Sequence, residues 1–318
     1  MALTIRVAML NADIPVPNVL ADRGSYGAIF HRLLIAAAHR VSSPATPVTI
    51  EAAEFDVVHG EYPSSLVDWD ALVISGSISA SYDDEPWIHS LDQYLRDVHR
   101  EHTHVRIFGS CFGHQIICQS LLREHGVRVE KDPKGYELGV HEIQLTDAFA
   151  RALGGKTVES AKASPIGPDR LPTPDLDAED TQLQPPGLSQ EQTLRLQFIH
   201  ADHVRLPSPE GEGEEAGSLP PSWISMGRSR HCAVQGVYQP GRVLTYQGHF
   251  EFDRFVNSET MKVFFAKRDP AVLQDALVAI DKDDDSEAAA DIVVRFLLEG
   301  RQLAEQGDGG LLTPPLKT

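Results

Sequence analysis

The clearest chemical signal in the sequence is a cysteine flanked by glycines, in GSCFG at 109–113. A short apolar run, Val105 to Phe108, predicts a buried strand before it, and a helix is predicted from about 114 to 122. A nucleophile placed on such a strand-to-helix turn is typical of a nucleophile elbow. The helix N-terminus favours a thiolate and an anion formed beside it. We therefore expect Cys111 to be a nucleophile, the alternative being a small buried hydrophobic residue.

A nucleophilic thiol needs a base, and His249 is the best placed of the 14 histidines. It follows a predicted strand, Arg242 to Tyr246, in the segment YQGHFEF at 246–252. Because the carboxyl ends of parallel strands share one edge of a sheet, Cys111 and His249 are expected to meet there. The alternative is a surface or capping histidine.

Glu251 is the predicted orienting group for that base. It lies two residues after His249, so in an extended chain both side chains leave on the same face. Its carboxylate can accept the imidazole N–H and fix the tautomer. Asp202 and Asp253 are the next candidates for this role.

The elements around these residues indicate an α/β fold with an open, mostly parallel sheet and flanking helices. The second half is richer in strands and includes a hairpin joined by QPG at 239–241. The strands are predicted at 4–10, 48–58, 71–75, 105–108, 140–146, 194–199, 233–238 and 242–246, and the helices at 25–38, 86–99 and 114–122, with Ser25 as an N-cap.

Two segments break this pattern and are expected to be solvated insertions. Residues 162–192 are rich in Pro, Asp and Gln, and 207–222 is acidic with Pro and Gly. We expect a catalytic domain over 1–270 that carries both insertions. Residues 271–318 are expected to be a helical extension with a flexible tail.

Composition excludes several classes of protein. The 318 residues carry a net charge of −18, which disfavours binding to nucleic acid. Three cysteines without a CxxC motif fit a reducing compartment rather than a disulfide framework. No apolar run approaches the roughly 18–20 residues of a membrane span, and no signal peptide is apparent. The expectation is a soluble, cytoplasmic protein without a membrane partner.

Three other features have simpler explanations. His200 and His203 lack the spacing of a helical metal-ligand pair, so no metal is expected. Cys118 lies two helical turns after Cys111 and is expected to pack in the core. Asp83–Glu85 predicts a solvated turn that caps the helix beginning at Pro86, with recognition of a substrate ammonium as a minor alternative.

Two motifs together carry a family resemblance. GSCFGHQI (109–116) and QGVYQPGRVLTYQGHFEF (235–252) resemble the class I glutamine amidotransferases, whose hallmarks are G-x-C-x-G-x-Q and a later G-H-x-E. The likeness extends to 75–88, 135–146 and 199–204 and spans roughly residues 3–268. Stand-alone GMP-synthase-like members, which include γ-glutamyl peptidases, are the most similar. The resemblance implies a flavodoxin-like sheet.

The resemblance also assigns roles within this sequence. It implies a Cys–His–Glu triad, an oxyanion hole of backbone N–H groups, contacts to substrate, and neither cofactor nor metal. Phe250 and Ser110 depart from the family pattern, with Pro and Ile or Val commoner there, and are expected to affect pocket shape more than competence. The implied residues are Cys111, His249 and Glu251 (triad), Phe112 with Gly76 or Ser77 (oxyanion hole), and Gln115, Gly139, Val140 and His141 (substrate).

The implied chemistry is hydrolysis of a γ-glutamyl amide through a glutamyl thioester. No P-loop motif GxxxxGK[ST] occurs, and the stretch after Pro270 is too short for a synthase. The favoured expectation is a γ-glutamyl peptidase acting on glutathione-type peptides or conjugates. The alternatives are a glutaminase subunit that delivers ammonia to a separate synthase, and a catalytically silent binding module.

Overall fold

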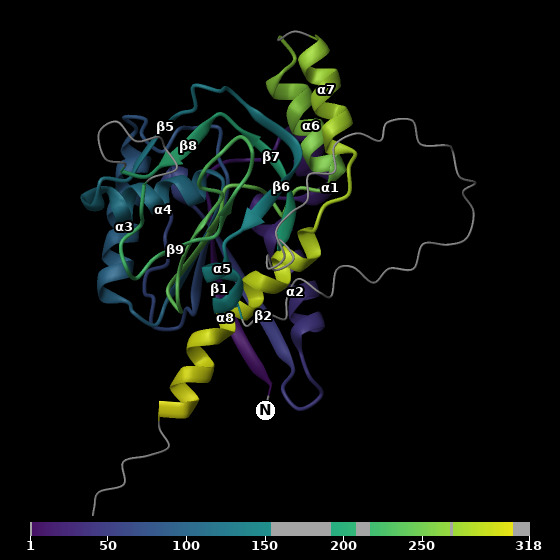
Figure 1. Cartoon of the computed structure of the whole chain (residues 1–318). Helices are drawn as coiled ribbons and strands as arrows, with labels where there is room; N and C mark the ends of the chain where they lie inside the picture. Colours follow the sequence, from purple (N-terminus) through teal and green to yellow (C-terminus); the bar gives the residue numbers. More distant parts are fainter. Residues whose placement is uncertain (1, 154–191, 208–216, 268–269, 308–318) are drawn as a thin grey trace, which may run out of the picture.

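A seven-stranded sheet forms the centre of the molecule (Figure 1). The computed structural model describes residues 2–153, 192–207, 217–267 and 270–307. The strand order is β2-β1-β3-β4-β12-β11-β9, in which the first five strands are parallel and the last two are antiparallel to their neighbours. The predicted open, mostly parallel α/β sheet is confirmed.

Two smaller sheets accompany the central one, with strand orders β10-β6-β7 and β5-β8. The predicted hairpin is present, because β11 and β12 are paired antiparallel. The strands are β1 (Leu3–Asn11), β2 (Val48–Asp56), β3 (Ala71–Ile74), β4 (Arg106–Ser110), β5 (Arg128–Lys131), β6 (Glu137–Leu145), β7 (Thr193–His200), β8 (Asp202–Arg205), β9 (Ile224–Ser225), β10 (Gly227–Arg228), β11 (Val237–Gln239) and β12 (Val243–Tyr246).

The helices begin and end close to the predicted positions. Ser25 caps α2 as expected, since its side chain accepts a hydrogen bond from the backbone N–H of Ala28. The helices are α1 (Pro17–Arg23), α2 (Tyr26–Val41), α3 (Pro86–Glu101), α4 (Phe112–Leu122), α5 (Asp147–Ala152), α6 (Arg254–Phe264), α7 (Pro270–Ile280) and α8 (Ser286–Gly307), with 3₁₀ turns at Val57–His59 and Arg123–His125.

The predicted side-chain cap before α3 is wrong. Glu85 occupies the N-cap position without a side-chain hydrogen bond to the helix, and Pro86 begins the helix. Pro86 suits this first position, because its fixed φ is already helical and it has no N–H that needs a partner. Asp83 instead accepts from the N–H of Ala80, which closes the preceding turn.

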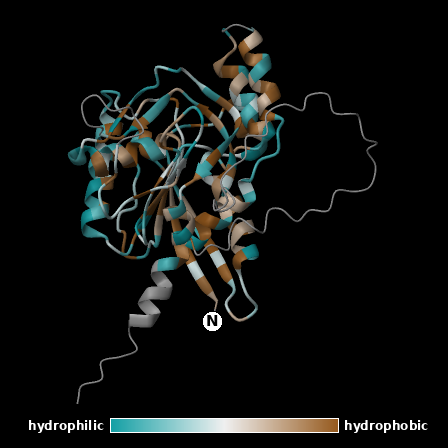
Figure 2. Ribbon diagram, in the orientation of Figure 1, coloured by the Kyte–Doolittle hydropathy of each residue, from teal (hydrophilic) through white to brown (hydrophobic). Residues whose placement is uncertain are grey.

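Alternating side chains of the buried strands contribute to two cores. On β1, Ile5, Val7 and Met9 face the core under α2 and α8. Ala8 and Leu10 face the core under α3 and α4. Figure 2 shows hydrophobic residues along the central strands, with mixed colours on the helices around them. Within the described ranges, no helix is both long enough and apolar enough to cross a bilayer.

The C-terminal extension is helical, as expected, but it is not peripheral. Helix α8 packs on α2, and its Val293 and Phe296 are fully buried in the same core as β1. Arg40 of α2 donates to Asp291 of α8 at 2.8 Å. The expected tail at 308–318 lies outside the described residues.

The two expected insertions also fall mostly outside the described residues, which omit 154–191 and 208–216. The described end of the second one is not wholly solvated. Leu219 is partly buried and packs on the core under α3 and α4, followed by the buried Trp223.

Candidate active site

Cys111 occupies a strained turn between β4 and α4. Its φ of +52° and ψ of −107° place it in a region that side chains rarely adopt, and among the described residues it is the only non-glycine with positive φ. Its backbone N–H donates to the carbonyl of Tyr246 on the neighbouring strand β12. Strain of this kind persists where the surrounding structure enforces it, and it often marks a functional residue.

The glycines on either side of the Cys111–Phe112 elbow are required by packing. A β-carbon on Gly113 would lie 2.5 Å from the carbonyl oxygen of Ile74, and one on Gly109 would lie 2.5 Å from the carbonyl carbon of Gly113. Both contacts are with backbone atoms, which cannot move aside. Helix α4 therefore packs closely against β3 and β4. It begins at Phe112, two residues before the predicted start.

His249 and Cys111 both lie against the turn that follows β3. A β-carbon on Gly76 would lie 3.1 Å from Cε1 of His249 and 3.6 Å from Cβ of Cys111. All three residues are buried, with Cys111 6% and His249 2% exposed. The carboxyl ends of β3, β4 and β12 thus converge as the parallel topology predicts.

Glu251 holds the imidazole from the other side. Its Oε1 lies 2.7 Å from Nδ1 of His249, and both groups are almost fully buried. Because the carboxylate accepts, Nδ1 donates, which leaves Nε2 for the thiol side. Burial lowers the pKa of His249, but the charges of Glu251 and Cys111 and hydrogen bonds to them outweigh it and raise the pKa well above its ordinary value.

Aromatic stacking further fixes the histidine. The ring of Phe252 lies 4.0 Å from the His249 ring, with 20° between their planes. Tyr26 in turn stacks on Phe252, with 6.0 Å between the ring centroids. Burial raises the pKa of Tyr26, as do the nearby charges of Asp13, Glu251 and Cys111. The tyrosine therefore stays neutral at the rim of the site.

Neither alternative orienting group contacts His249 in the structure. Asp202 accepts from the hydroxyl of Tyr82 at 2.9 Å, and Asp253 caps α6 and pairs with Arg23. Glu251 is therefore the carboxylate that the fold places on the histidine.

The backbone around Gly76 is held by a serine that the sequence analysis did not single out. The hydroxyl of Ser75 accepts from the N–H of Ala12 at 2.9 Å and donates to the carbonyl of Gly76 at 3.0 Å. These bonds fix the plane of the peptide between Gly76 and Ser77. On the other side of the thiol, Phe112 is the first residue of α4, so its N–H has no partner within the helix.

Gln115 is buried beneath the site and is fully occupied as a donor. Its amide nitrogen donates to the carbonyl of Asp202 at 3.0 Å and to Oε1 of Gln247 at 3.1 Å. The ring of His200 lies against the same carbonyl, with Nδ1 2.9 Å from the Asp202 oxygen, and its Nε2 lies 2.9 Å from Oε2 of Glu137. Gln115 thus ties α4 to the turn at 201–202.

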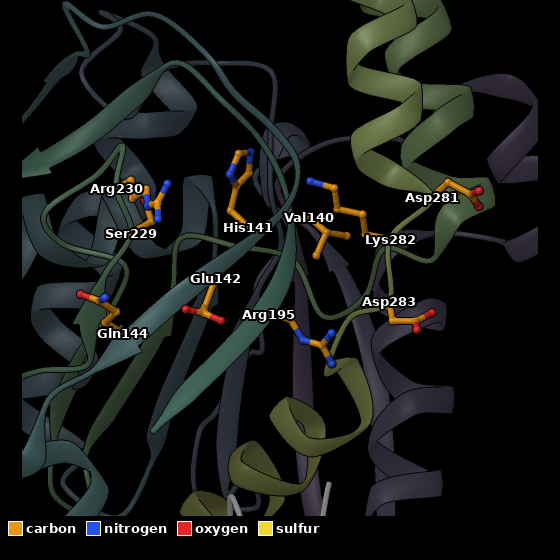
Figure 3. Close-up of a pocket in the computed structure, with 10 residues that line it drawn as sticks. All are labelled: Val140, His141, Glu142, Gln144, Arg195, Ser229, Arg230, Asp281, Lys282 and Asp283. Atoms are coloured by element: carbon orange, nitrogen blue, oxygen red, sulfur yellow. The ribbon is translucent and has the colours of Figure 1, made fainter. Parts of the chain in front are cut away.

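The segment from Gly139 to His141 lies elsewhere. Gly139 packs on α7, where an added β-carbon would lie 2.4 Å from that of Ala279. Strand β7 separates the segment from His249, whose N–H donates to Gln197 on the far side. Val140 and His141 line a cavity of about 670 Å³ on β6 and β7, together with Arg195, Arg230 and Lys282 (Figure 3). Their predicted role in binding substrate gains no support from this position.

The remaining sequence features have structural roles. Cys118 is fully buried, as predicted, and burial raises its pKa. Phe250, expected to shape the pocket, lies instead in the core against Phe30 and Phe108. Across the described ranges, no group of three or more His, Cys, Asp or Glu side chains is arranged to hold a metal ion.

Known proteins of similar sequence support the resemblance. A glutamine amidotransferase-like protein of Schizosaccharomyces pombe is 26% identical over 300 residues, covering 92% of this chain and 98% of its own. The chain is similar to the glutamine amidotransferase-like proteins over nearly its whole length. Another relative, γ-glutamyl peptidase 2 of Arabidopsis thaliana, is 24% identical over 258 residues, covering 78% of this chain and 82% of its own. No protein-family profile matches the chain.

Solved structures of similar fold support the architecture described above. A glutamine amidotransferase from Thermotoga maritima has a TM-score of 0.54 at 14% identity, covering 92% of this chain and 98% of its own. One from Methylobacillus flagellatus also has a TM-score of 0.54, at 17% identity and with 94% and 95% coverage. At these identities the likeness supports the architecture alone.

Proposed function

We propose that the protein is a cysteine-dependent hydrolase of γ-glutamyl amide bonds. The observation that carries the proposal is the convergence of three groups. A cysteine on a strained elbow lies beside a buried histidine, and that histidine is held at 2.7 Å by a buried glutamate. A silent binding module would gain nothing from burying such a charged pair, since the desolvation of a buried ion pair can cost more than the attraction between its charges returns.

The chemistry runs in two halves. The Cys111 thiolate attacks the γ-carbonyl carbon and forms a tetrahedral oxyanion. The C–N bond breaks as the His249 imidazolium protonates the departing nitrogen, which leaves a glutamyl thioester on sulfur. His249 then takes a proton from water, which attacks the thioester, breaks the C–S bond and releases glutamate, so that the Cys111 thiolate and the His249 imidazolium are restored. Glu251 stabilises the imidazolium in both halves.

Backbone N–H groups are proposed to hold the oxyanion. The N–H of Phe112 is unpaired within its helix, and the peptide between Gly76 and Ser77 is fixed by Ser75. Donors that are already oriented stabilise the developing charge without reorganisation, an effect typically worth a factor of about 10²–10³ in rate for each donor.

For the glutamyl α-amino and α-carboxylate groups, the turn at 201–202 is a better candidate than 139–141. Gln115 and His200 fix this turn beside the N-terminal half of α4. We propose that Gln115 acts on the substrate through the turn that it holds rather than by direct contact.

The favoured substrate is a γ-glutamyl peptide such as glutathione or a conjugate, supported by the γ-glutamyl peptidase relative. The test is to incubate purified protein with glutamine, glutathione and a glutathione S-conjugate and to follow free glutamate, with Cys111→Ala as control. Release from the peptides but not from glutamine is expected. Release from glutamine alone would indicate a subunit that supplies ammonia to a synthase, and no release from any would contradict the proposal.

A further inference from the structure

The residue before the nucleophile contacts the triad glutamate. Ser110 is fully buried, and its Oγ lies 2.9 Å from Oε1 of Glu251. The carbonyl of Gly248 is a more distant acceptor at 3.3 Å. Because a carboxylate only accepts, the hydroxyl donates to Glu251. This contact points to a role for Ser110 beyond the expected effect on the shape of the pocket.

The register of the sheet produces the contact. Ser110 is the last residue of β4 and pairs with Tyr246, the last residue of β12. The chain that follows β12 therefore begins beside Ser110 and carries His249 and Glu251 back over it.

Few groups among the described residues donate a hydrogen bond to the Glu251 carboxylate. Oε1 accepts from both Ser110 and Nδ1 of His249, whereas the buried Oε2 has no hydrogen-bond partner in the described part of the chain. A buried carboxylate needs donors to compensate for lost hydration. Ser110 is thus the one donor to this carboxylate, among the side-chain contacts of the described residues, that does not take part in proton transfer.

We propose that Ser110 is a positioning residue of the site, whose hydroxyl holds Glu251 in the plane and distance that orient His249. The inference rests on the proposed function for its catalytic consequence, but the contact itself does not depend on which substrate is cleaved. Ser110 acts through Glu251 and touches neither substrate nor the reacting atoms.

The catalytic test compares two nearly isosteric variants, Ser110→Thr and Ser110→Val, which differ in the hydroxyl. Losing a hydrogen bond to the charged Glu251 should lower kcat by roughly tenfold or more. We expect Ser110→Val and Ser110→Ala to show this loss with little change in KM, and Ser110→Thr to retain most activity. Ser120→Ala is the matched control, because Ser120 is a buried serine on α4 whose hydroxyl has no hydrogen-bond partner among the residues that the structure describes.

A second readout does not require a substrate. The rate of Cys111 alkylation by iodoacetamide is measured against pH for the wild type, Ser110→Ala and Ser120→Ala. A misplaced Glu251 stabilises the imidazolium less, so the Ser110→Ala profile should move to higher pH while the control overlays the wild type. If the wild type cleaves no γ-glutamyl compound, the proposed function fails and this profile still decides the role of Ser110.

Two results would overturn the inference. One is a Ser110→Ala alkylation profile that overlays the wild type. The other is equal kcat in the threonine and valine variants. If the added methyl group prevents both from folding, as circular dichroism would reveal, the comparison of Ser110→Ala with wild type decides, since alanine only removes an atom.

Discussion

The charge on His249 governs the chemistry at the scale of single residues. The imidazole is buried, so only the nearby negative charge of Glu251 and of the thiolate keeps it protonated. A protonated histidine stabilises the thiolate before attack and supplies the proton that the departing nitrogen needs. Changes at Glu251 should therefore affect turnover more than binding.

We expect Glu251→Gln to lower kcat by roughly a hundredfold or more while KM changes little. The amide keeps the size of the side chain but loses the charge that stabilises the imidazolium and can select the wrong tautomer. Steady-state kinetics on the best substrate provide the measurement. Wild-type kcat in this variant would remove Glu251 from the site, and Asp253→Asn, at the cap of α6, is the matched control.

The pH dependence of turnover tests the same charge. Because the pKa of His249 is raised, the imidazole stays protonated as pH rises through the ordinary range of histidine, and it loses its proton only above that range. The alkaline limb of kcat/KM should accordingly lie well above the ordinary histidine pKa, and in Glu251→Gln it should move to lower pH. An alkaline limb at the ordinary value in the wild type would contradict the account.

Sequence spacing could predict Cys111, His249 and Glu251, because the elbow motif and the two-residue period of an extended chain are local. It could not predict the contact from Ser110 to Glu251. That contact depends on the register between β4 and β12, strands that are more than 130 residues apart in the chain. The position of the segment at 139–141 also depends on strand pairing, so motif likeness is the sole basis on which the sequence predicts it to lie near the substrate.

At the scale of elements, the distance between α4 and β3 sets the position of the nucleophile. Gly113 on α4 is the point of closest approach, directly over the carbonyl of Ile74. Glycine within a helix costs about 1 kcal/mol relative to alanine, so it is retained here for packing.

Gly113→Ala tests which effect is larger. Helix propensity alone predicts a gain of about 1 kcal/mol, but the added β-carbon would lie 2.5 Å from a backbone oxygen. Overpacking of this kind typically costs about 1–3 kcal/mol, so we expect a lower free energy of unfolding and a displaced, less active Cys111. Urea denaturation measures the change, with Ser120→Ala on the same helix for comparison. An increase in stability would mean that the helix moves away without cost.

At the scale of the whole molecule, α8 completes the core. The acidic run DKDDDSE at 281–287 falls within the stretch that the sequence predicted to be a helical extension of the catalytic domain. In the structure Asp285 accepts from Arg195 on β7, which directs the chain back so that α8 covers the sheet beside α2. Long-range pairs of this kind leave no periodic signal in the sequence.

Phe296→Ala tests whether α8 belongs to the catalytic unit. Phe296 is fully buried against Tyr238 and the core shared with β1. Its truncation should therefore lower the free energy of unfolding by roughly 3–5 kcal/mol. The whole chain should still unfold in a single transition, at a lower temperature. Val278→Ala on α7, where the side chain is 61% exposed, should change stability by less than about 0.5 kcal/mol. An unchanged main transition in Phe296→Ala would indicate that the extension is a separate unit.

The central claim is that Cys111 forms the covalent intermediate, and trapping that intermediate tests it most directly. Protein is mixed with a γ-glutamyl substrate, quenched in acid within one turnover, digested, and examined by mass spectrometry. The account predicts a glutamyl adduct on the peptide that contains Cys111, with none on Cys118 or Cys232, whose thiols are buried and have raised pKa values. It also predicts no adduct in Cys111→Ala. Glutamate release without an adduct on Cys111, or release that persists in Cys111→Ala, would contradict it.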